Sequence, residues 1–599
     1  MSSTTTATPP QRPLLILYAT ETGTAQDVAE QLAREAKRRW FDVRVLGMDE
    51  YDRSQLINEP LVVFICSTTG QGEEPAPMTK FWKFLLRKTH PADILSHMHA
   101  AVFGLGDSSY AKFNFPAKKL YKRLAQLGAQ MLLPRGDGDD QHYMGYEGGL
   151  DPWLEGFWEK VLAKWPIPKG KEIVSAETIP EPSFEIRFLE DEPTATNAVD
   201  AGDATAEPHH RRPTRLTAHL TTNTRLTAPT HPQDVRHLEF ALPPSTTYNP
   251  ADVMLIHPQN LPTEVALVLD HFNWTSIADK VFTLHPTADH ISLPAHLPTP
   301  LTLRNLLTCH LDILGRPRKF FFHLLAFFTT DPLHAAKLRE FTTPEGASEL
   351  FSYVTKPRRT MWEILQDFTS ATVPLKYLLD LIPPLRPRSF SIASSPAVHP
   401  HTIHLCVAIV GYRTKLQKQR TGVCTAYLAH LTPPSPVRFE IKRGSLRLPR
   451  DPTTPVIFVG PGTGVAPLRS LIQHRAHANR AHLDTLVFGN RNRHADFLYQ
   501  PEWEHLERAG MKLLTAWSRD QDTKIYVQDR MREHEAGVGE TMRKGGWVLV
   551  SGSANRMPKD VTAALVDIVA SQYSMTPADA EEEVRKWVSE GRVQMECWS

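Results

Sequence analysis

The stretch LLILYATETGTA, residues 14–25, joins an apolar run to a threonine-rich loop. An amphipathic segment over residues 25–39 follows directly. This order predicts a buried strand, a loop and a helix. Because backbone N–H groups gather at a helix start, the loop and its threonine hydroxyls could hold a phosphate without a cationic side chain. Taken alone, the pattern also fits an ordinary threonine-rich helix cap.

Two later segments repeat the order of strand and loop. The apolar run 61–66 leads into STTGQG, and the run 100–104 leads into LGDSSY. Parallel strands in an open α/β sheet present such loops at one edge, where ligands bind. Tyr110 and Phe113 could stack there on a planar ring, although each also fits an ordinary core aromatic. A fourth loop, GDGDDQ at 136–141, either joins this edge or is a solvated acidic turn.

The middle of the chain predicts a strand-rich module with a helical insertion. Residues 215–243 alternate as strands do, whereas 301–341 and 360–381 have helical patterns. In RPRSFSIASS, alternation puts Arg388 and Phe390 on one strand face, where they could meet the pyrophosphate and the ring of one ligand. A salt-bridged arginine on an edge strand is the alternative. The segment GVCT, 422–425, opens a helix and suits a second phosphate contact.

The C-terminal part contains a glycine-rich loop, GPGTGVAP at 460–467, between a predicted strand and a predicted helix. That context is moderately specific for a dinucleotide phosphate. The next strand lacks the carboxylate that would select the free ribose of NAD. We expect Lys524, Tyr526 and Gln528 to share a strand face and, with Arg519, to grip a 2′-phosphate while Tyr526 stacks on adenine. A solvated basic edge strand is the alternative.

Composition narrows the class of protein. The chain has 599 residues, enough for about three to five domains. Lysine and arginine number 67 against 66 acidic residues, so nucleic acid is a poor candidate partner. The five cysteines have no disulfide or metal-site spacing, so we expect no metal. No run reaches the roughly 18 apolar residues of a membrane span, and we expect no membrane anchor.

The loops TETGTAQD, STTGQG, FGLGDSSYAKFN and GDGDDQ, in this order, resemble the FMN domain of the diflavin reductases. RSFS and GVCT resemble the two FAD signatures of the ferredoxin-NADP⁺ reductase family, at the spacing found in diflavin reductases. The resemblance implies a multidomain α/β protein. Its expected parts are a disordered N-terminus (1–12), a flavodoxin-like FMN domain (13–165), a linker (166–213), a β-barrel FAD domain (214–450) with a helical insertion (about 300–385), and a Rossmann-like NADPH domain (451–599).

The resemblance also implies the cofactor contacts. FMN would contact Thr20, Glu21, Thr22, Gly23, Thr24, Ala25, Ser67, Thr68, Thr69, Gly70, Leu105, Gly106, Asp107, Ser108, Ser109, Tyr110, Ala111, Lys112, Phe113, Asn114 and Asp140. FAD would contact Arg358, Arg388, Ser389, Phe390, Ser391, Gly422, Val423, Cys424, Thr425 and Trp598. NADP would contact Thr463, Ser518, Arg519, Lys524, Ile525, Tyr526, Val527, Gln528 and Asp560.

Hydride transfer is assigned by the same resemblance to Ser391, Ser551, Glu596 and Trp598. Trp598 would cover the flavin and move aside for the nicotinamide. Four positions depart from the family: Thr69 replaces an aromatic residue, Phe390 a tyrosine, Ser551 a cysteine and Glu596 an aspartate. We expect hydride transfer to survive, because the cofactors carry the chemistry and the protein orients them.

The implied activity is an NADPH-dependent oxidoreductase that passes electrons from NADPH to FAD, then to FMN, and finally to an acceptor protein. Within the family, the chain resembles the members that reduce an anamorsin-type iron–sulfur protein in cytosolic iron–sulfur cluster assembly. Alternatives are another acceptor, such as a P450, a sulfite reductase hemoprotein or methionine synthase, and a flavin-free scaffold. The expected location is the cytoplasm, with association with mitochondria left open.

Overall fold

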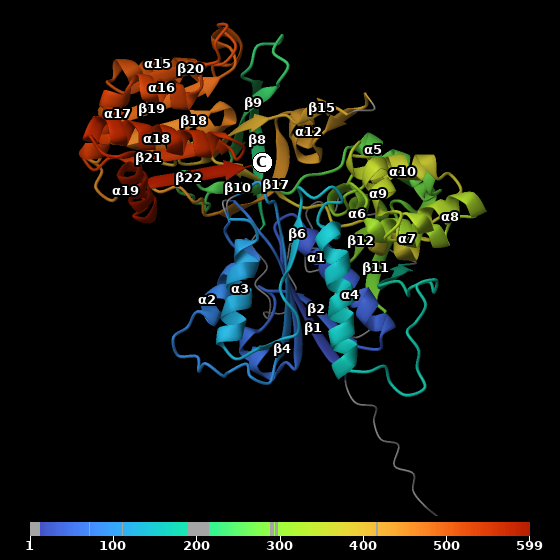
Figure 1. The fold of residues 1–599 in the computed structure, drawn as a ribbon. Coiled ribbons are helices and arrows are strands. Elements are labelled where there is room, and N and C mark those ends of the chain that lie inside the picture. The colour runs from blue at the N-terminus through green and yellow to red at the C-terminus, as the bar shows by residue number, and fades with distance from the viewer. Residues whose placement is uncertain are drawn as a thin grey trace, which may run out of the picture. The chain divides into compact units, whose positions relative to one another are not determined.

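The computed structural model describes residues 12–70, 72–110, 112–189, 215–287, 293, 297–414 and 417–598. The chain divides into two compact units (Figure 1). Within the described residues, the first unit holds 12–189 and 262–386, and the second holds 215–261 and 387–598. Ala111, the linker segment 190–213 and all of the expected N-terminal tail except Arg12 lie outside the described residues. Arg12 is ordered, because its Nη2 donates to the Trp165 carbonyl at 2.7 Å.

The first unit contains a parallel sheet with strand order β2-β1-β3-β4-β5, and β6 pairs with β4. The strands are β1 (Pro13–Ala19), β2 (Asp42–Gly47), β3 (Leu61–Ser67), β4 (His99–Gly106), β5 (Gln130–Met131) and β6 (Gly136–Asp139). Its helices are α1 (Thr24–Arg38), α2 (Ala76–Leu85), α3 (Phe115–Gln126), α4 (Glu147–Lys164) and the short η1 (Arg53–Asn58).

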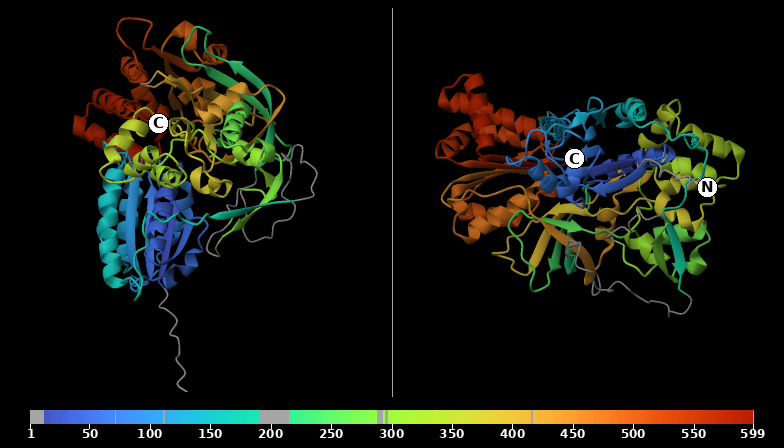
Figure 2. Two further views of the ribbon diagram at one scale, coloured as in Figure 1. Left: turned by 90° about the vertical axis from the view of Figure 1, so that its right-hand side faces the viewer. Right: turned by 90° about the horizontal axis from the view of Figure 1, so that it is seen from below.

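The two faces of this sheet are buried by different helices. Leu14 and Ile16 point to the face covered by α1 and α4, whereas Leu15 and Leu17 point to the face covered by α2 and α3. This follows from strand alternation, since every second side chain points to the same face. The left view of Figure 2 shows the blue strands running side by side. The flavodoxin-like fold predicted from the four loops in order is confirmed.

A mostly helical segment completes the first unit around one apolar cluster that includes Phe282, Phe322 and Leu378. Its helices are α5 (Pro262–His271), η2 (Thr275–Ile277), α6 (Leu303–Cys309), α7 (Lys319–Phe327), α8 (Pro332–Glu340), α9 (Ala347–Leu350), η3 (Phe351–Thr355), α10 (Met361–Asp367), η4 (Leu375–Tyr377) and α11 (Leu378–Leu381). Its sheet has the order β12 (Leu301–Thr302), β11 (Val281–Pro286) and β7 (Phe184–Phe188).

Strand β7 lies within the stretch expected to be linker, so that expectation is wrong for residues 184–188. The short sequence FEIRF has no partner nearby in the chain. It becomes a strand because it pairs with β11, about 95 residues later in the chain. In this pairing Phe188 lies opposite Phe282.

The second unit begins with an antiparallel sheet of order β13-β10-β17-β8-β9-β14. An isolated bridge between Ile392 and Leu405 joins its two end strands and closes the barrel. The elements are β8 (Leu216–Arg225), β9 (Val235–Ala241), β10 (Val253–Ile256), β13 (Arg388–Ser391), β14 (Thr402–Ala408), β17 (Ser435–Lys442), the hairpin β15 (Gly411–Arg413) and β16 (Gln419–Thr421), and α12 (Val423–His430). The β-barrel predicted for this part is therefore present.

The C-terminal part is a parallel sheet of order β20-β19-β18-β21-β22. Its strands are β18 (Val456–Pro461), β19 (Asp484–Asn490), β20 (Lys512–Trp517), β21 (Trp547–Ser553) and β22 (Val593–Trp598). Its helices are η5 (Gly462–Gly464), α13 (Val465–His477), η6 (Ala481–Leu483), α14 (Arg493–Asp496), α15 (Gln500–Arg508), α16 (Val527–Glu533), α17 (Glu535–Arg543), α18 (Met557–Tyr573) and α19 (Pro577–Ser589).

The strand expected over 524–528 is wrong, because helix α16 begins at Val527. Asp529 accepts a hydrogen bond from the Tyr526 backbone N–H at 2.9 Å and so caps this helix. Val527 is buried in the core. Helix capping therefore prevails over the alternation of the basic and polar residues. None of the helices in the described part of the chain is long and apolar enough to cross a membrane.

Candidate functional site

The first loop of the flavodoxin-like sheet forms an anion cradle. Gly23 is the N-cap of α1, has a φ of 97° and is joined to α1 without a side-chain cap. The Gly23 N–H donates to Thr20 Oγ1 at 2.9 Å, which fixes the turn. The first N–H groups of a helix lack intrahelical partners, so those of Thr24 and Ala25 can bind a phosphate. The loop therefore fits the phosphate of FMN.

Asn114 holds the third and fourth loops together. It is fully buried with a φ of 50°, and its Nδ2 donates to Asp137 Oδ1 at 3.0 Å and to the carbonyl oxygens of Gly104 and Gly138. The Ser108 N–H donates to Asp139 Oδ1 at 2.9 Å, which adds a second link. These bonds keep two loops in register at the carboxyl edge of the sheet.

The second and third loops pack directly on each other. A Cβ on Gly72 would lie only 2.3 Å from the Cβ of Lys112, so only glycine fits there. Tyr110 and Phe113 are half-buried in the third loop. Thr69 bonds to its own turn, with Oγ1 donating to the Glu73 carbonyl at 3.3 Å. The structure thus gathers the predicted FMN residues that it describes, and Ala111 lies outside the described residues.

Charge at this edge is predominantly acidic. Burial, followed by the nearby charge of Asp107, raises the pKa of Asp140. Asp137 pairs with Arg135 at 2.5 Å, and Glu74 pairs with Lys119 at 3.4 Å. The charges of Asp137 and Glu74 are therefore partly neutralised by these neighbours.

Two arginines beside the phosphate loop were not predicted from the sequence. Arg318 Nη1 donates to the Gly23 carbonyl at 3.2 Å and pairs with Asp27 at 3.2 Å. Arg386 Nε lies 3.4 Å from the position of a Cβ on Gly23. Both come from the helical segment of the same unit. No local pattern in the sequence could link them to a loop some 300 residues earlier.

The two motifs expected to bind FAD meet in the barrel. Burial raises the pKa of the Cys424 thiol to about 12, and the charge of Arg388 opposes this shift, which places Arg388 near GVCT. Gly422 is the N-cap of α12 with no side-chain cap bond, and a Cβ on it would lie 2.9 Å from Thr425 Oγ1. The helix start is therefore shaped for a phosphate oxygen. Arg358 lies in the other unit, in a turn after η3 with a φ of 54°.

Ser391, Ser551 and Glu596 lie close together. The Ser391 hydroxyl donates to Glu596 Oε1 at 3.0 Å, and the Ser445 N–H donates to Glu596 Oε2 at 3.1 Å. Ser551 is paired with Glu596 in the register of β21 and β22. The Ser551 hydroxyl is fully buried and has no hydrogen-bond partner among the described residues. Trp598 ends β22 two residues after Glu596 and is 40% exposed.

The glycine-rich loop after β18 leaves room for a nucleotide. Gly464 packs so tightly that a Cβ would lie 2.1 Å from the Ser551 carbonyl oxygen, whereas a Cβ on Gly462 would meet nothing within 4 Å. Backbone bonds from Ser518 and Arg519 to the 490–491 segment, at 3.0 and 2.9 Å, hold the exposed Arg519 beside the end of β19. This arrangement fits a dinucleotide phosphate.

The other residues expected to bind NADP differ in how exposed they are. Lys524 and Tyr526 are exposed, and Asp560 is half-buried in the first turn of α18. Val527 is only 2% exposed, so its side chain belongs to the core rather than to a ligand surface.

Comparisons with known proteins agree with this architecture. The flavodoxin family profile matches residues 16–153, the FAD-binding domain profile matches 208–427, and the oxidoreductase NAD-binding domain profile matches 458–563. The chain is similar to proteins named NADPH-dependent diflavin oxidoreductase 1. It is 44% identical to the Danio rerio protein (98% of this chain, 99% of the relative), 42% to that of Bos taurus (98% and 100%) and 38% to that of Arabidopsis thaliana (98% and 99%).

Proposed function

The chain belongs to the NADPH-dependent diflavin oxidoreductase 1 family, and from this premise we propose that its acceptor is an anamorsin-type iron–sulfur protein of cytosolic iron–sulfur cluster assembly. The chain is an NADPH-dependent diflavin oxidoreductase with binding domains for FMN, FAD and NADPH. When bound, these cofactors supply hydride transfer from NADPH to FAD and electron transfer from FAD to FMN.

We assign FMN binding to the carboxyl edge of the first sheet. The uncapped start of α1 would hold the phosphate, and the loops joined by Asn114 would hold the ring, with Tyr110 stacking on it. The missing aromatic side chain at Thr69 would leave one ring face less covered. We assign FAD to Arg388, Phe390 and the start of α12, and the 2′-phosphate of NADPH to Arg519 and Lys524.

We assign hydride transfer to the C-terminal end of β22. Glu596 orients the Ser391 hydroxyl, and Ser551, whose buried hydroxyl has no partner among the described residues, lies on the neighbouring strand. Trp598, exposed at the end of the strand, is free to cover or uncover this place. These residues orient the reactants and exclude water, while the cofactors transfer the hydride.

The acidic edge of the FMN domain supports the proposed acceptor. Glu73, Asp107, Asp139 and Asp140 lie in the loops at that edge. A surface of this kind attracts a partner that carries a basic patch near its redox centre. The choice of an iron–sulfur protein over other acceptors rests on the family resemblance.

Anaerobic reduction of purified acceptors, driven by NADPH, tests this proposal. The acceptors are an anamorsin-type iron–sulfur protein, a P450, a sulfite reductase hemoprotein and methionine synthase. We expect kcat/KM to be highest for the iron–sulfur protein. A higher value for any of the others would replace it as the acceptor.

The remaining alternatives concern cofactors and location. A flavin-free scaffold has no support, because matches to both flavin domain profiles and to the nucleotide profile are present.

We place the enzyme in the cytoplasm, and association with mitochondria is the alternative. Cell fractionation with an antibody against the chain distinguishes the two.

A further inference from the structure

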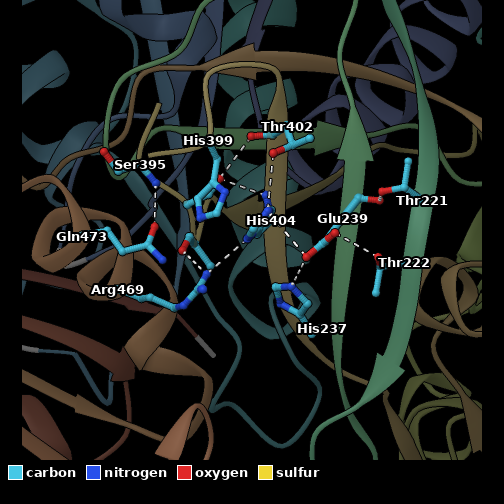
Figure 3. A network of polar contacts seen from close by, with 12 residues as sticks. Thr221, Thr222, His237, Glu239, Ser395, His399, Thr402, His404, Arg469 and Gln473 are labelled. Atoms are coloured by element: carbon cyan, nitrogen blue, oxygen red, sulfur yellow. Dashed lines mark hydrogen bonds and ion pairs between the residues drawn. The ribbon is translucent and has the colours of Figure 1, made fainter. Parts of the chain in front are cut away.

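Two histidines and a glutamate gather on neighbouring barrel strands. Strands β9 and β14 pair antiparallel, with Glu239 directly opposite His404. His237 lies two residues before Glu239, on the same face of β9. Figure 3 shows the three side chains pointing toward one another. One potential ligand atom from each lies within 4.8 Å of the other two.

The spacing of these atoms suits a small metal ion. Glu239 Oε1 lies 3.0 Å from His237 Nε2 and 3.7 Å from His404 Nε2. A tetrahedral site with metal–ligand bonds of about 2.0–2.1 Å places its ligand atoms about 3.3 Å apart. The two measured distances bracket that value, so small side-chain movements would complete the geometry.

Further contacts hold the ligand atoms in place. Thr222 Oγ1 donates to Glu239 Oε2 at 2.9 Å, which leaves Oε1 facing the histidines. The Tyr499 hydroxyl lies 3.0 Å from His237 Nδ1, which leaves Nε2 facing the centre. Metal-bound histidines and carboxylates usually have such partners on their outer atoms. Glu239 and His237 already have this outer arrangement, and His404 is the exception.

Among the described residues drawn in Figure 3, Arg469 is the one arginine or lysine beside the cluster. Its Nη1 lies 3.4 Å from His404 Nδ1, but it also donates to the Ala393 carbonyl at 2.8 Å, and its Nε pairs with Glu502 at 2.7 Å. With an ion on His404 Nε2, Nδ1 carries the ring proton. Two donors would then face each other, so the Arg469 guanidinium has to move away from Nδ1, while its bonds to the Ala393 carbonyl and to Glu502 can remain.

The burial of the three side chains also suits a bound ion. The side chains of His404 and His237 are 6% and 13% exposed, so their nitrogens are largely shielded from water. The side chain of Glu239 is 32% exposed and gives access from solvent.

A simple hydrogen-bonded pair would need only one histidine. The same barrel contains such a pair, in which His257 Nε2 lies 2.9 Å from Glu440 Oε1. The cluster differs by a second imidazole nitrogen near the same carboxylate oxygen. A bound metal ion needs this second nitrogen as a ligand, whereas a histidine–glutamate ion pair does not need it.

We propose that His237, Glu239 and His404 bind one divalent transition-metal ion, with Zn²⁺ the best match to two imidazoles and a carboxylate, and water in the fourth position. The ion links β9 to β14. Through Tyr499, which precedes α15, and Arg469 of α13, it also links the barrel to the nucleotide-binding sheet. None of the three ligands is among the residues assigned to hydride transfer.

The test uses the full-length enzyme with its flavins bound and fully oxidised. The protein is stripped with a chelator and titrated with Zn²⁺ in a calorimeter, and bound metal is measured by mass spectrometry after gel filtration. We expect one Zn²⁺ per chain and a higher Tm with Zn²⁺ than without it. His237→Gln and Glu239→Gln should each weaken binding at least about tenfold, since both remove a direct ligand.

His257→Gln is the matched control, because it breaks a histidine–glutamate pair in the same barrel without touching the cluster. It should bind Zn²⁺ as the wild type does. FAD content and the Tm without metal show that each variant is folded. If His237→Gln does not fold, Glu239→Gln, which changes the most exposed of the three side chains, decides the question. Equal Zn²⁺ uptake by wild type and a folded ligand variant, or no uptake by the wild type, overturns the proposal.

Discussion

The hydroxyl of Ser391 donates a hydrogen bond to Oε1 of Glu596 across 3.0 Å and thereby joins the FAD barrel to the last strand of the chain. Ser551 stands opposite Glu596 on the neighbouring strand. Three residues from distant parts of the sequence are thus held at one place. Their arrangement is the geometric basis for assigning hydride transfer to this end of β22.

Ser391→Ala should lower the rate of NADPH-driven ferricyanide reduction by about ten- to a hundredfold. A hydrogen bond to a charged group is worth about 1.5–3 kcal/mol, and the variant removes the hydroxyl that Glu596 orients. Ser445→Ala is the control, because it removes another hydroxyl that donates to Glu596 but leaves the bond from Ser391 intact. Wild-type turnover in the Ser391 variant, with FAD fully bound, would remove this serine from the hydride-transfer step.

Trp598→Ala should relax the discrimination against NADH and slow turnover. The indole is 40% exposed at the end of β22, and aromatic stacking is favourable by about 0.5–1.5 kcal/mol beyond burial. Without the indole, the nicotinamide would bind more tightly and the oxidised nucleotide would leave late. The measurement is steady-state kinetics with both nucleotides. An unchanged ratio of NADH to NADPH activity would show that the indole does not cover the flavin.

Arg519→Ala combined with Lys524→Ala should raise the KM for NADPH more than tenfold and leave that for NADH almost unchanged. Both side chains are exposed in the segment between β20 and α16, and charge-assisted bonds to a phosphate are worth about 1.5–3 kcal/mol each. Arg508→Ala, which changes an exposed cation on α15, is a suitable control. Equal use of both nucleotides by the wild-type enzyme would contradict the assignment.

The parts of the fold that were predictable are those encoded locally. The strand, loop and helix at residues 14–25 appear as β1 and α1, because apolar runs and helix starts leave a signal within a few residues. The strand expected over residues 524–528 is wrong. The alternating residues there fit both a strand and the start of a helix, and the cap formed by Asp529 stabilises the helix. Arg318 and the partnership of His237 with His404 could not be predicted, since only tertiary folding brings such residues together.

Tyr110→Ala should lose FMN and acceptor reduction yet keep ferricyanide reduction by NADPH. Arg388→Ala should lose FAD and both activities. The two residues lie in different units, Tyr110 in the third loop of the flavodoxin-like sheet and Arg388 on β13 of the barrel. Flavin content after heat release, separated by chromatography, measures the outcome. Loss of FAD with retention of FMN in the Tyr110 variant would reverse the assignment of the two flavins.

Acceptor reduction should slow steeply as salt rises from about 0.1 M to about 1 M. Over that range the Debye length falls from about 10 Å to about 3 Å, which suppresses steering by the acidic loops around the FMN edge. Asp139→Asn with Asp140→Asn should therefore lower kcat/KM for the acceptor without loss of FMN. However, Asp139 Oδ1 accepts bonds from the Ser108 and Gln141 N–H groups, so this variant also changes the loop.

Glu73→Gln with Glu74→Gln is the cleaner test of the same surface. The Glu74 carboxylate makes a half-buried ion pair with Lys119 at 3.4 Å, and a single pair at that distance contributes little to stability. Removing both charges should reduce kcat/KM at low salt and have less effect at high salt, where steering is already screened. Ferricyanide reduction should not change, because it does not depend on a basic protein surface. A flat salt profile with wild-type activity in both double variants would exclude electrostatic docking at this edge. Glu73, Glu74, Asp139 and Asp140 would then have no role in binding the acceptor.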